Sequence, residues 1–325
     1  MSVPTPAIAA ASVSSPTSSR ALRGYAWGVL GYNVAVILWG AAVRATGSGA
    51  GCGEHWPLCN GSVIQQHPTV ATLIEYAHRA TSGIALIAVI ALVFWAFSGT
   101  VKRHLARVAA IAALIFTLDE ALLGALLVLL GKTAQDQSIS RAVYLALHLT
   151  NTLLMLAALT LTAHFLSRKR GYMRGSIEIR GAGLASAGLI AVILTGVTGA
   201  LAALADTLHP STNLLAALAQ DFSGHSSWIV RIRWAHPVVS LIAGLFVLEI
   251  ILLGVRNAFN HRLAAGLAGL LLLQYALGLT DLALLAPLTM QILHLFGADL
   301  LWITLVILVA RLSVRPLGCT AATCG

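Results

Sequence analysis

Charged residues are scarce in this sequence of 325 residues: Asp, Glu, Lys and Arg make up 10% of it, whereas hydrophobic residues make up 58%. Soluble globular proteins carry about 25% charged residues. Soluble enzymes are therefore excluded, and so are disordered chains, which lack hydrophobic residues. The 4 cysteines are too few for a small secreted scaffold that depends on disulfides. Together with a mean hydropathy of +0.87, these shortages predict a polytopic membrane protein.

Acidic residues are also few, 11 against 20 Lys and Arg, which gives a net charge of +9. The basic residues do not form the amphipathic or aromatic-interleaved stripe of a nucleic-acid-binding surface, so no nucleic-acid partner is predicted. Most of them lie between apolar runs, and each run is long enough to cross a hydrocarbon core about 30 Å thick as a helix. The runs lie near 24–45, 70–97, 107–130, 142–166, 182–205, 228–254, 263–285 and 287–310. The sequence therefore predicts an all-α integral membrane protein with eight transmembrane helices.

The distribution of Lys and Arg predicts the orientation of these helices. An even number of crossings puts both termini on one side, and the loops of the opposite side hold only Lys132 and Arg141. Cytoplasmic loops carry an excess of Lys and Arg. We therefore expect a multi-pass protein of the bacterial cytoplasmic (inner) membrane, with both termini in the cytoplasm.

The predicted helices fall into two copies of four. The matching segments are Tyr76-Ala77-His78 with Trp234-Ala235-His236, Leu147-His148-Leu149 with Leu293-His294-Leu295, Ile37–Gly40 with Ile193–Gly196, and Glu120–Gly124 with Gln274–Gly278. This repeat predicts two tandem pseudo-symmetric four-helix bundles. The expected domains are a disordered cytoplasmic tail (1–22), an N-terminal bundle (23–167), a basic cytoplasmic linker (168–180), a C-terminal bundle (181–312) and a cytoplasmic tail (313–325).

Histidines in the predicted spans are the leading functional candidates. Each of His78, His148, His236 and His294 lies seven or eight residues from the outer end of its helix, which corresponds to a depth of roughly 10–12 Å. A single histidine in a span is usually a hydrogen-bonded packing residue. Strongly polar residues in spans are costly, however, and these share one depth with two in each repeat. The pattern predicts two paired metal or haem sites.

The residues around the histidines discriminate between metals. Glu75 and His78 have the Glu-x-x-His spacing of di-iron bundles, but the positions three before the other histidines are Leu145, Arg233 and Gln291. A di-iron centre is therefore disfavoured. Zinc is disfavoured because two imidazoles do not complete its coordination. Two histidines that face each other across a bundle suit the axial positions of a haem.

Other ionisable residues near the outer helix ends complete the candidate sites. Arg44, Arg79, Arg231 and Arg233 are expected to contact haem propionates or the rim of the site. The first repeat has Glu75 where the second has Arg233, and a desolvated carboxylate beside a haem is costly in a purely structural site. Glu75 is thus the candidate catalytic residue. The alternative is a carboxylate that is simply paired with Arg79 or Arg44.

Two cysteines lie in the loop after the first span. Cys52 and Cys59 flank a Trp-Pro turn on the predicted outer side, where disulfides persist. We expect a Cys52–Cys59 disulfide; His55 between them raises a metal site as a weaker alternative. Cys319 and Cys324 lie in the predicted cytoplasmic tail and receive no role.

Three motifs together resemble the haem A synthase family: Val43–Gly49 (VRATGSG), Trp56–Gly61 (WPLCNG) and Glu75–Arg79 (EYAHR). The resemblance extends over residues 24–311. It implies a membrane oxidoreductase that converts the C8 methyl group of haem O into the formyl group of haem A, for cytochrome oxidase. It further implies that His78 and His148 bind haem O, that His236 and His294 ligate a haem b cofactor, and that Glu75 is catalytic.

The sequence departs from the family in two places. Many members carry a second cysteine pair in the loop at 205–227, which has no cysteine here, and Asp119-Glu120 stand where the family tends to have Gln. The sequence gives no reason for these two acidic residues.

Other functions remain open at this point. The main alternative is a bis-histidine dihaem cytochrome that exchanges electrons with quinone, which would need neither Glu75 nor the disulfide. A haem exporter is disfavoured because the inner halves of the histidine-bearing helices are nearly uniformly apolar. The expected partners are haem O, a haem O synthase and an unidentified electron acceptor or donor. Homo-oligomerisation and the source of the oxygen atom are left open.

Overall fold

The computed structural model describes residues 18–168, 177–179 and 182–316. It contains 8 helices that are long and apolar enough to cross a membrane, which confirms the predicted multi-pass α-helical membrane protein. They are α1 (Arg20–Ala45), α2 (Val70–Gly99), α3 (Leu105–Leu129), α4 (Ile139–Ser167), α5 (Ala182–Leu208), α8 (Ala235–Val255, whose span includes α7), α9 (His261–Ala283) and α10 (Leu288–Ser313).

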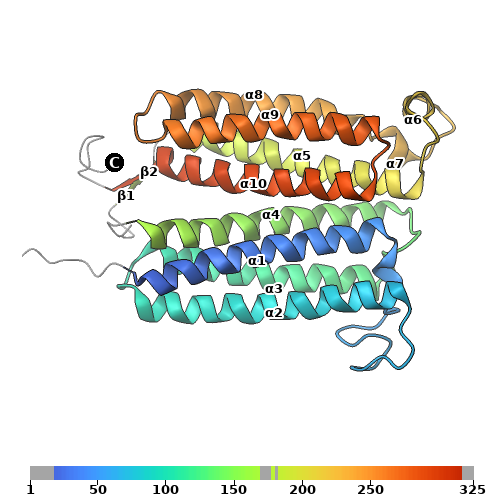
Figure 1. Ribbon diagram of the computed structural model, residues 1–325, viewed down its shortest axis with the longest axis horizontal. Helices are drawn as coiled ribbons and strands as arrows, with labels where there is room; N and C mark the ends of the chain where they lie inside the picture. Colours follow the sequence, from blue (N-terminus) through green and yellow to red (C-terminus); the bar gives the residue numbers. More distant parts are fainter. Residues whose placement is uncertain (1–17, 169–176, 180–181, 317–325) are drawn as a thin grey trace, which may run out of the picture.

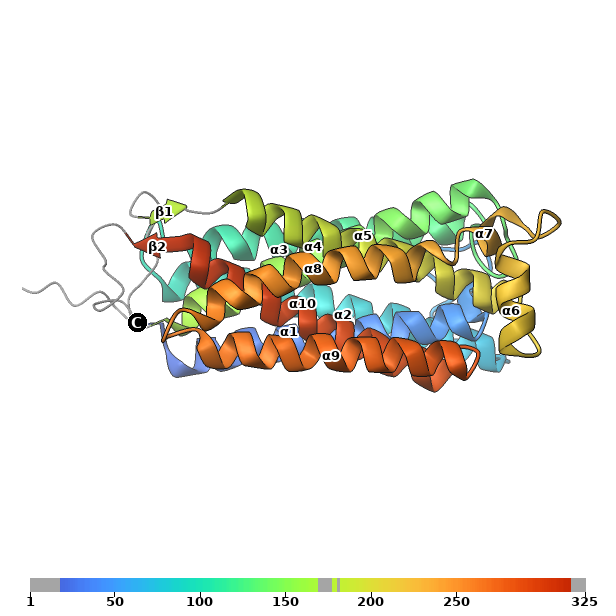
Figure 2. The ribbon, with the colours of Figure 1, turned by 90° about the horizontal axis from the view of Figure 1, so that it is seen from above.

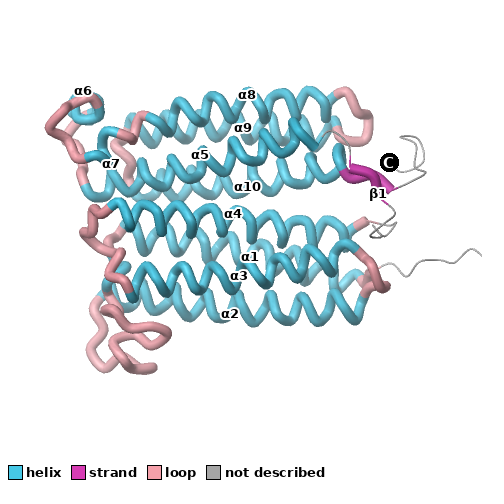
Figure 3. Tube along the Cα trace, turned by 180° about the vertical axis from the view of Figure 1, so that it is seen from behind, coloured by secondary structure: helices cyan, strands magenta, loops and turns pink. Residues whose placement is uncertain are grey.

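Shorter elements lie at both ends of the spans. One end carries η1 (Ser48–Ala50), α6 (Leu214–Asp221) and α7 (Trp228–Arg231), and α6 runs across the helix ends (Figure 2). The opposite end carries a small antiparallel pair, β1 (Ile177–Ile179) with β2 (Val314–Pro316), which the all-α expectation lacked (Figure 3).

Two boundaries need correction. Helix α1 begins at Arg20, inside the stretch 1–22 expected to be a tail, because the Ser19 hydroxyl accepts a hydrogen bond from Leu22 N–H (3.1 Å) and caps the first turn. The strands β1 and β2 fall in the ranges 168–180 and 313–325, which were expected to be a linker and a tail. Cys319 and Cys324 lie outside the described residues.

The long helices pack as two groups of four (Figure 1). In the first bundle, α1, α2, α3 and α4 each contact two neighbours in a closed ring. In the second bundle, α5, α8, α9 and α10 also form a ring, and α8 and α10 contact each other across it. The bundles meet where α4 packs on α5 and α10 and where α1 packs on α10. The buried indole of Trp302 on α10 donates to the carbonyl of Leu153 on α4 (2.8 Å) across this contact. A pseudo-symmetric relation between the bundles stays a prediction.

The outer surfaces of both bundles are apolar. Ile87, Leu245 and Leu272 are 68%, 68% and 71% exposed. In water such a surface costs about 25 cal/mol per Å² of apolar area, whereas lipid tails impose no such cost. Such an outer surface is therefore suited to contact with lipid tails.

Candidate functional site

Each of the four candidate histidines lies against a glycine of the helix beside it. A Cβ added to that glycine would come close to the Cε1 atom of the imidazole in every case. The pairs are Gly40–His78 (2.9 Å), Gly124–His148 (3.8 Å), Gly199–His236 (2.9 Å) and Gly278–His294 (3.1 Å). The missing side chain makes room for a ring inside the bundle, and an alanine at Gly40 or Gly199, where the distance is 2.9 Å, would displace the imidazole.

These contacts show that one pair of glycines was wrongly aligned in the predicted repeat. The sequence aligned Gly40 with Gly196, but the glycine that contacts His236 is Gly199. A Cβ on Gly196 would instead lie 3.1 Å from Leu153 of α4, at the contact between the bundles. Gly196 therefore serves the packing of α5 against α4. The alignment of Glu120–Gly124 with Gln274–Gly278 matches the contacts made by Gly124 and Gly278.

The structure brings the histidines together within each bundle. The ring centroids of His236 and His294 are 6.3 Å apart, and the ring planes are inclined at 86° to each other. Two imidazoles that share one metal, each with a metal–nitrogen distance of roughly 2.0–2.1 Å, would have centroids about 6 Å apart. In the first bundle, His78 and His148 are close enough to interact electrostatically. The distance between the rings is thus that expected if His236 and His294 were to hold one metal between them.

The second nitrogen of each ring also bears on haem binding. His236 Nδ1 lies 3.2 Å from the carbonyl oxygen of Thr195 and 3.3 Å from the hydroxyl of Thr198. When Nδ1–H donates to the carbonyl, Nε2 is left free to ligate, as is usual for metal-bound histidines. Among the described residues, the buried Nδ1 atoms of His78, His148 and His294 have no partner. Buried nitrogens without partners suit sites that a bound group completes.

Glu120 is a functional candidate that the sequence left unexplained. Its carboxylate accepts hydrogen bonds from Asn151 Nδ2 (2.7 Å) and Thr152 Oγ1 (2.5 Å), and Oε1 lies 3.5 Å from Nε2 of His148. Asp119, by contrast, is exposed. The signal in the sequence was the repeat, because Glu120 precedes Gly124 by one turn just as Gln274 precedes Gly278.

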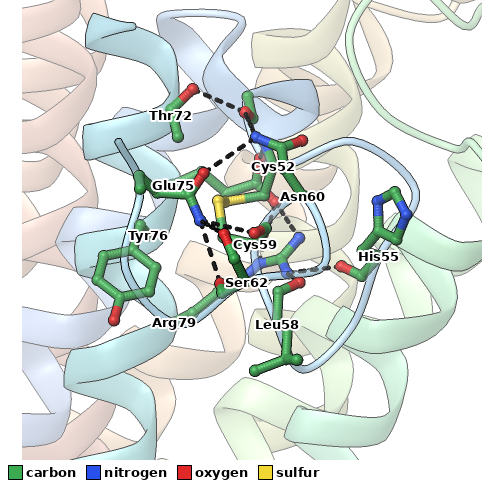
Figure 4. Close-up of a disulfide and its surroundings, with 12 residues drawn as sticks. Cys52, His55, Leu58, Cys59, Asn60, Ser62, Thr72, Glu75, Tyr76 and Arg79 are labelled. Atoms are coloured by element: carbon green, nitrogen blue, oxygen red, sulfur yellow. Dashed lines mark hydrogen bonds and ion pairs between the residues drawn. A yellow bond between two sulfur atoms is a disulfide. The ribbon is translucent and has the colours of Figure 1, made fainter. Parts of the chain in front are cut away.

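Glu75 is buried and fully paired (Figure 4). Oε1 accepts from Nη2 (2.5 Å) and Nε (3.2 Å) of Arg79, and Oε2 accepts from the backbone N–H of Cys52 (2.8 Å). The pair with Arg79 that the alternative named is present, but Glu75 is buried, and its catalytic role stays a prediction. The contacts arise from the i, i+4 spacing on α2 together with a loop that folds back over the helix start.

The loop above Glu75 is held by several contacts. Cys52 and Cys59 form the expected disulfide and are both fully buried. Gly51 lies so close to α2 that a Cβ would sit 2.4 Å from the carbonyl carbon of Ala71. Arg79 Nη1 donates to the carbonyls of His55 (2.6 Å) and Leu58 (3.0 Å), inside the ring closed by the disulfide. Arg79 thus ties the carboxylate and the loop together.

The other three arginines differ in their surroundings. Arg44 joins the bundles, because Nη1 donates to the Ala203 carbonyl (2.8 Å) and the Thr207 hydroxyl (3.1 Å) on α5 and Nη2 donates to Gln291 on α10 (2.9 Å). Arg233 pairs with Asp206 (2.6 Å) and Asp221 (2.7 Å) and donates to the Ala217 carbonyl (2.9 Å). Arg231 is exposed, and its side chain forms no hydrogen bond or ion pair with the described residues. Contact of these arginines with a haem stays a prediction.

Comparison with known proteins places this arrangement in a family. The family model COX15-CtaA, described as cytochrome oxidase assembly protein, matches residues 23–306, which include all four histidines. A Thermus thermophilus protein named protoheme IX farnesyltransferase is 46% identical over 300 residues, which is 90% of this chain and 48% of that protein. The chain therefore spans about half the length of that relative.

Proteins named heme A synthase match shorter stretches. The one from Alkalihalophilus pseudofirmus is 41% identical over 126 residues, covering 39% of this chain and 40% of that protein. The one from Exiguobacterium sp. is 40% identical over 124 residues, covering 38% of each. Because the family model extends over most of the residues, including both bundles, the chain belongs to the COX15-CtaA family of cytochrome oxidase assembly proteins.

Proposed function

We propose that this protein is a haem A synthase, which oxidises the C8 methyl group of haem O to a formyl group. The observation that carries the proposal is one histidine pair in each bundle. Each imidazole lies against a glycine of the neighbouring helix, and the two pairs have different surroundings. One pair belongs to a substrate and the other to a cofactor in this reading. The family and the names of its relatives support the same chemistry.

In this proposal the second bundle holds a haem b cofactor between His236 and His294, and the first holds haem O between His78 and His148. The bound haem b supplies a redox-active iron. The Thr195 carbonyl orients the ring of His236 through Nδ1. The conversion of methyl to formyl takes up the oxygen atom of one water and releases four electrons and four protons, so water and an external electron acceptor are part of the proposal.

The outer loop would shield the first site. The disulfide ring lies on the start of α2 and is fixed there by Arg79 and by the hydrogen bond from Thr72 Oγ1 to the Gly51 carbonyl (2.8 Å). Glu75 would act from beneath this loop, with Arg79 and the Cys52 amide holding its negative charge in place. A fixed carboxylate stabilises positive charge that develops nearby without reorganisation.

The proposal extends to partners and orientation. The Thermus thermophilus relative that aligns with this chain over 48% of its own length carries the name protoheme IX farnesyltransferase. Haem O is a farnesylated haem. We therefore propose a haem O synthase as the supplier of the substrate. The excess of Lys and Arg on the side of the termini supports cytoplasmic termini.

A second candidate is a dihaem cytochrome that exchanges electrons with quinone. The observation in its favour is the pairing of Glu75 with Arg79, since a carboxylate whose role is structural would show the same contacts. An electron carrier would hold both haems permanently and would leave haem O unchanged.

The test is haem A formation in cells that make haem O but lack a haem A synthase. Extraction and chromatography of the pigments should show haem A with the wild-type protein. His78→Ala should abolish haem A and leave the haem b spectrum, whereas His236→Ala should remove the haem b spectrum. Haem b without any haem A in the wild type would favour the electron carrier. Equal loss of haem b in both variants would contradict the assignment of the bundles.

A further inference from the structure

Glu120 is held in one orientation by two buried side chains of α4. Asn151 Nδ2 donates both to Glu120 Oε2 (2.7 Å) and to the carbonyl of Phe116 on α3 (2.8 Å). Thr152 Oγ1 donates to Glu120 Oε1 (2.5 Å). Asn151 and Thr152 are only 7% and 5% exposed. The carboxylate is therefore a fixed group within the bundle, with its orientation set by these two donors.

The imidazole of His148 lies against this carboxylate. Oε1 of Glu120 is 3.5 Å from Nε2, somewhat longer than a hydrogen bond but within the range of an ion pair. Gly124, one turn further along α3, approaches the Cε1 side of the same ring. The face of α3 formed by Glu120 and Gly124 thus borders the ring, and Glu120 is the polar group that this face presents to it.

The second bundle lacks this arrangement. Gln274 takes the place of Glu120, and its Nε2 donates to the backbone carbonyl of His294 (2.8 Å) instead of facing the ring. The positions three and four after His294 are Gly297 and Ala298, where Asn151 and Thr152 follow His148. A Cβ at Gly297 would meet Gln274 Oε1 at 2.5 Å. The carboxylate and both of its donors are therefore specific to the first bundle.

We propose that Glu120 is a positioning residue that shares the Nε2 side of His148 with a bound haem, which makes His148 the most readily exchanged of the four ligands. The inference rests on the proposed function. A substrate site must release its product, and a histidine ligand that exchanges readily allows this release. A site that keeps its cofactor needs no such exchange.

Carbon monoxide binding to the reduced protein tests this exchange, because it binds a haem that has lost one axial ligand. The protein is purified from cells that make haem O, reduced with dithionite and mixed with carbon monoxide. Wild-type protein should bind it at the first bundle, and Glu120→Gln should slow that binding about tenfold, which corresponds to about 1.4 kcal/mol. Thr152→Val removes one of the two donors that hold the Glu120 carboxylate. This variant should also slow carbon monoxide binding, by a smaller factor than Glu120→Gln.

The control is Gln274→Glu, which places a carboxylate in the second bundle without the two donors and should leave carbon monoxide binding unchanged. Wild-type kinetics in Glu120→Gln, with haem still present in the first bundle, would overturn the inference while leaving the proposed function intact. Absence of haem O from the first bundle would count against the proposed function instead.

A second measurement needs no haem. Nitrogen-15 NMR of histidine-labelled, haem-free protein in nanodiscs should show a distinct His148 signal, identified by its loss in His148→Gln. Glu120→Gln should shift this signal, and Gln274→Glu should not. An unshifted His148 signal in Glu120→Gln would refute the pair itself, whatever the protein does with haem.

Discussion

The ion pair between Glu75 and Arg79 gives the sharpest test of the structure. The Glu75 side chain is only 4% exposed and that of Arg79 12%. Arg79→Met keeps the aliphatic stem and removes the charge, so a buried carboxylate is left with the Cys52 N–H as its main partner. Removal of one partner from a buried pair costs about 3–5 kcal/mol, and the partial exposure of Arg79 argues for about 3 kcal/mol.

Glu75→Gln should cost less than Arg79→Met. The amide still accepts from the Cys52 N–H, and Arg79 keeps the carbonyls of His55 and Leu58. We expect about 1–2 kcal/mol for this variant. In the double variant Glu75→Gln/Arg79→Met no unpaired charge remains. Its loss of unfolding free energy should therefore be about 1.5 kcal/mol smaller than the sum of the two single losses.

The assay is the unfolding free energy in detergent micelles, measured by titration with a denaturing detergent. Arg231→Met is the matched control, since the Arg231 side chain is exposed and forms no hydrogen bond or ion pair with the described residues. Its free energy of unfolding should equal that of wild type. Additive single effects, or an Arg79→Met variant as stable as the control, would refute the pairing. Haem A yield measured on the same proteins separates the roles: under the proposed function, Glu75→Gln loses product even where its stability and haem b remain.

Three further outcomes follow from particular contacts. Loss of the disulfide in Cys52→Ala/Cys59→Ala, with a sequence separation of 7, should lower the unfolding free energy by about 2–3 kcal/mol; unchanged haem A turnover per folded molecule would then mean that the loop only stabilises the fold. Gly199→Ala should lower haem b content because its Cβ would lie 2.9 Å from His236, whereas Gly124→Ala at 3.8 Å should be tolerated; equal haem content in both would contradict the close packing. Arg44→Gln should cost about 2 kcal/mol by removing hydrogen bonds between the bundles, and a wild-type unfolding midpoint would show that the bundles do not depend on this residue.

The sequence by itself determined the features that depend on length, composition and local spacing. Eight spans follow from the number of apolar runs that match the thickness of a bilayer. The histidines stood out because polar residues in such runs are costly. The Cys52–Cys59 disulfide followed from two nearby cysteines in a loop on the expected oxidising side, and the structure confirms it.

Only the tertiary structure decided which side chains meet. The sequence offered Arg79 or Arg44 as a partner for Glu75, but neither hydropathy nor helix period reveals that the Cys52 amide folds back onto it. Glu120 had no interpretation until the rotation of α3 against α4 set it beside His148. Likewise, the glycine that contacts His236 is Gly199 and not Gly196. The side chains of both helices fix the relative rotation and axial shift of a packed pair, and an alignment of two sequence repeats does not specify these.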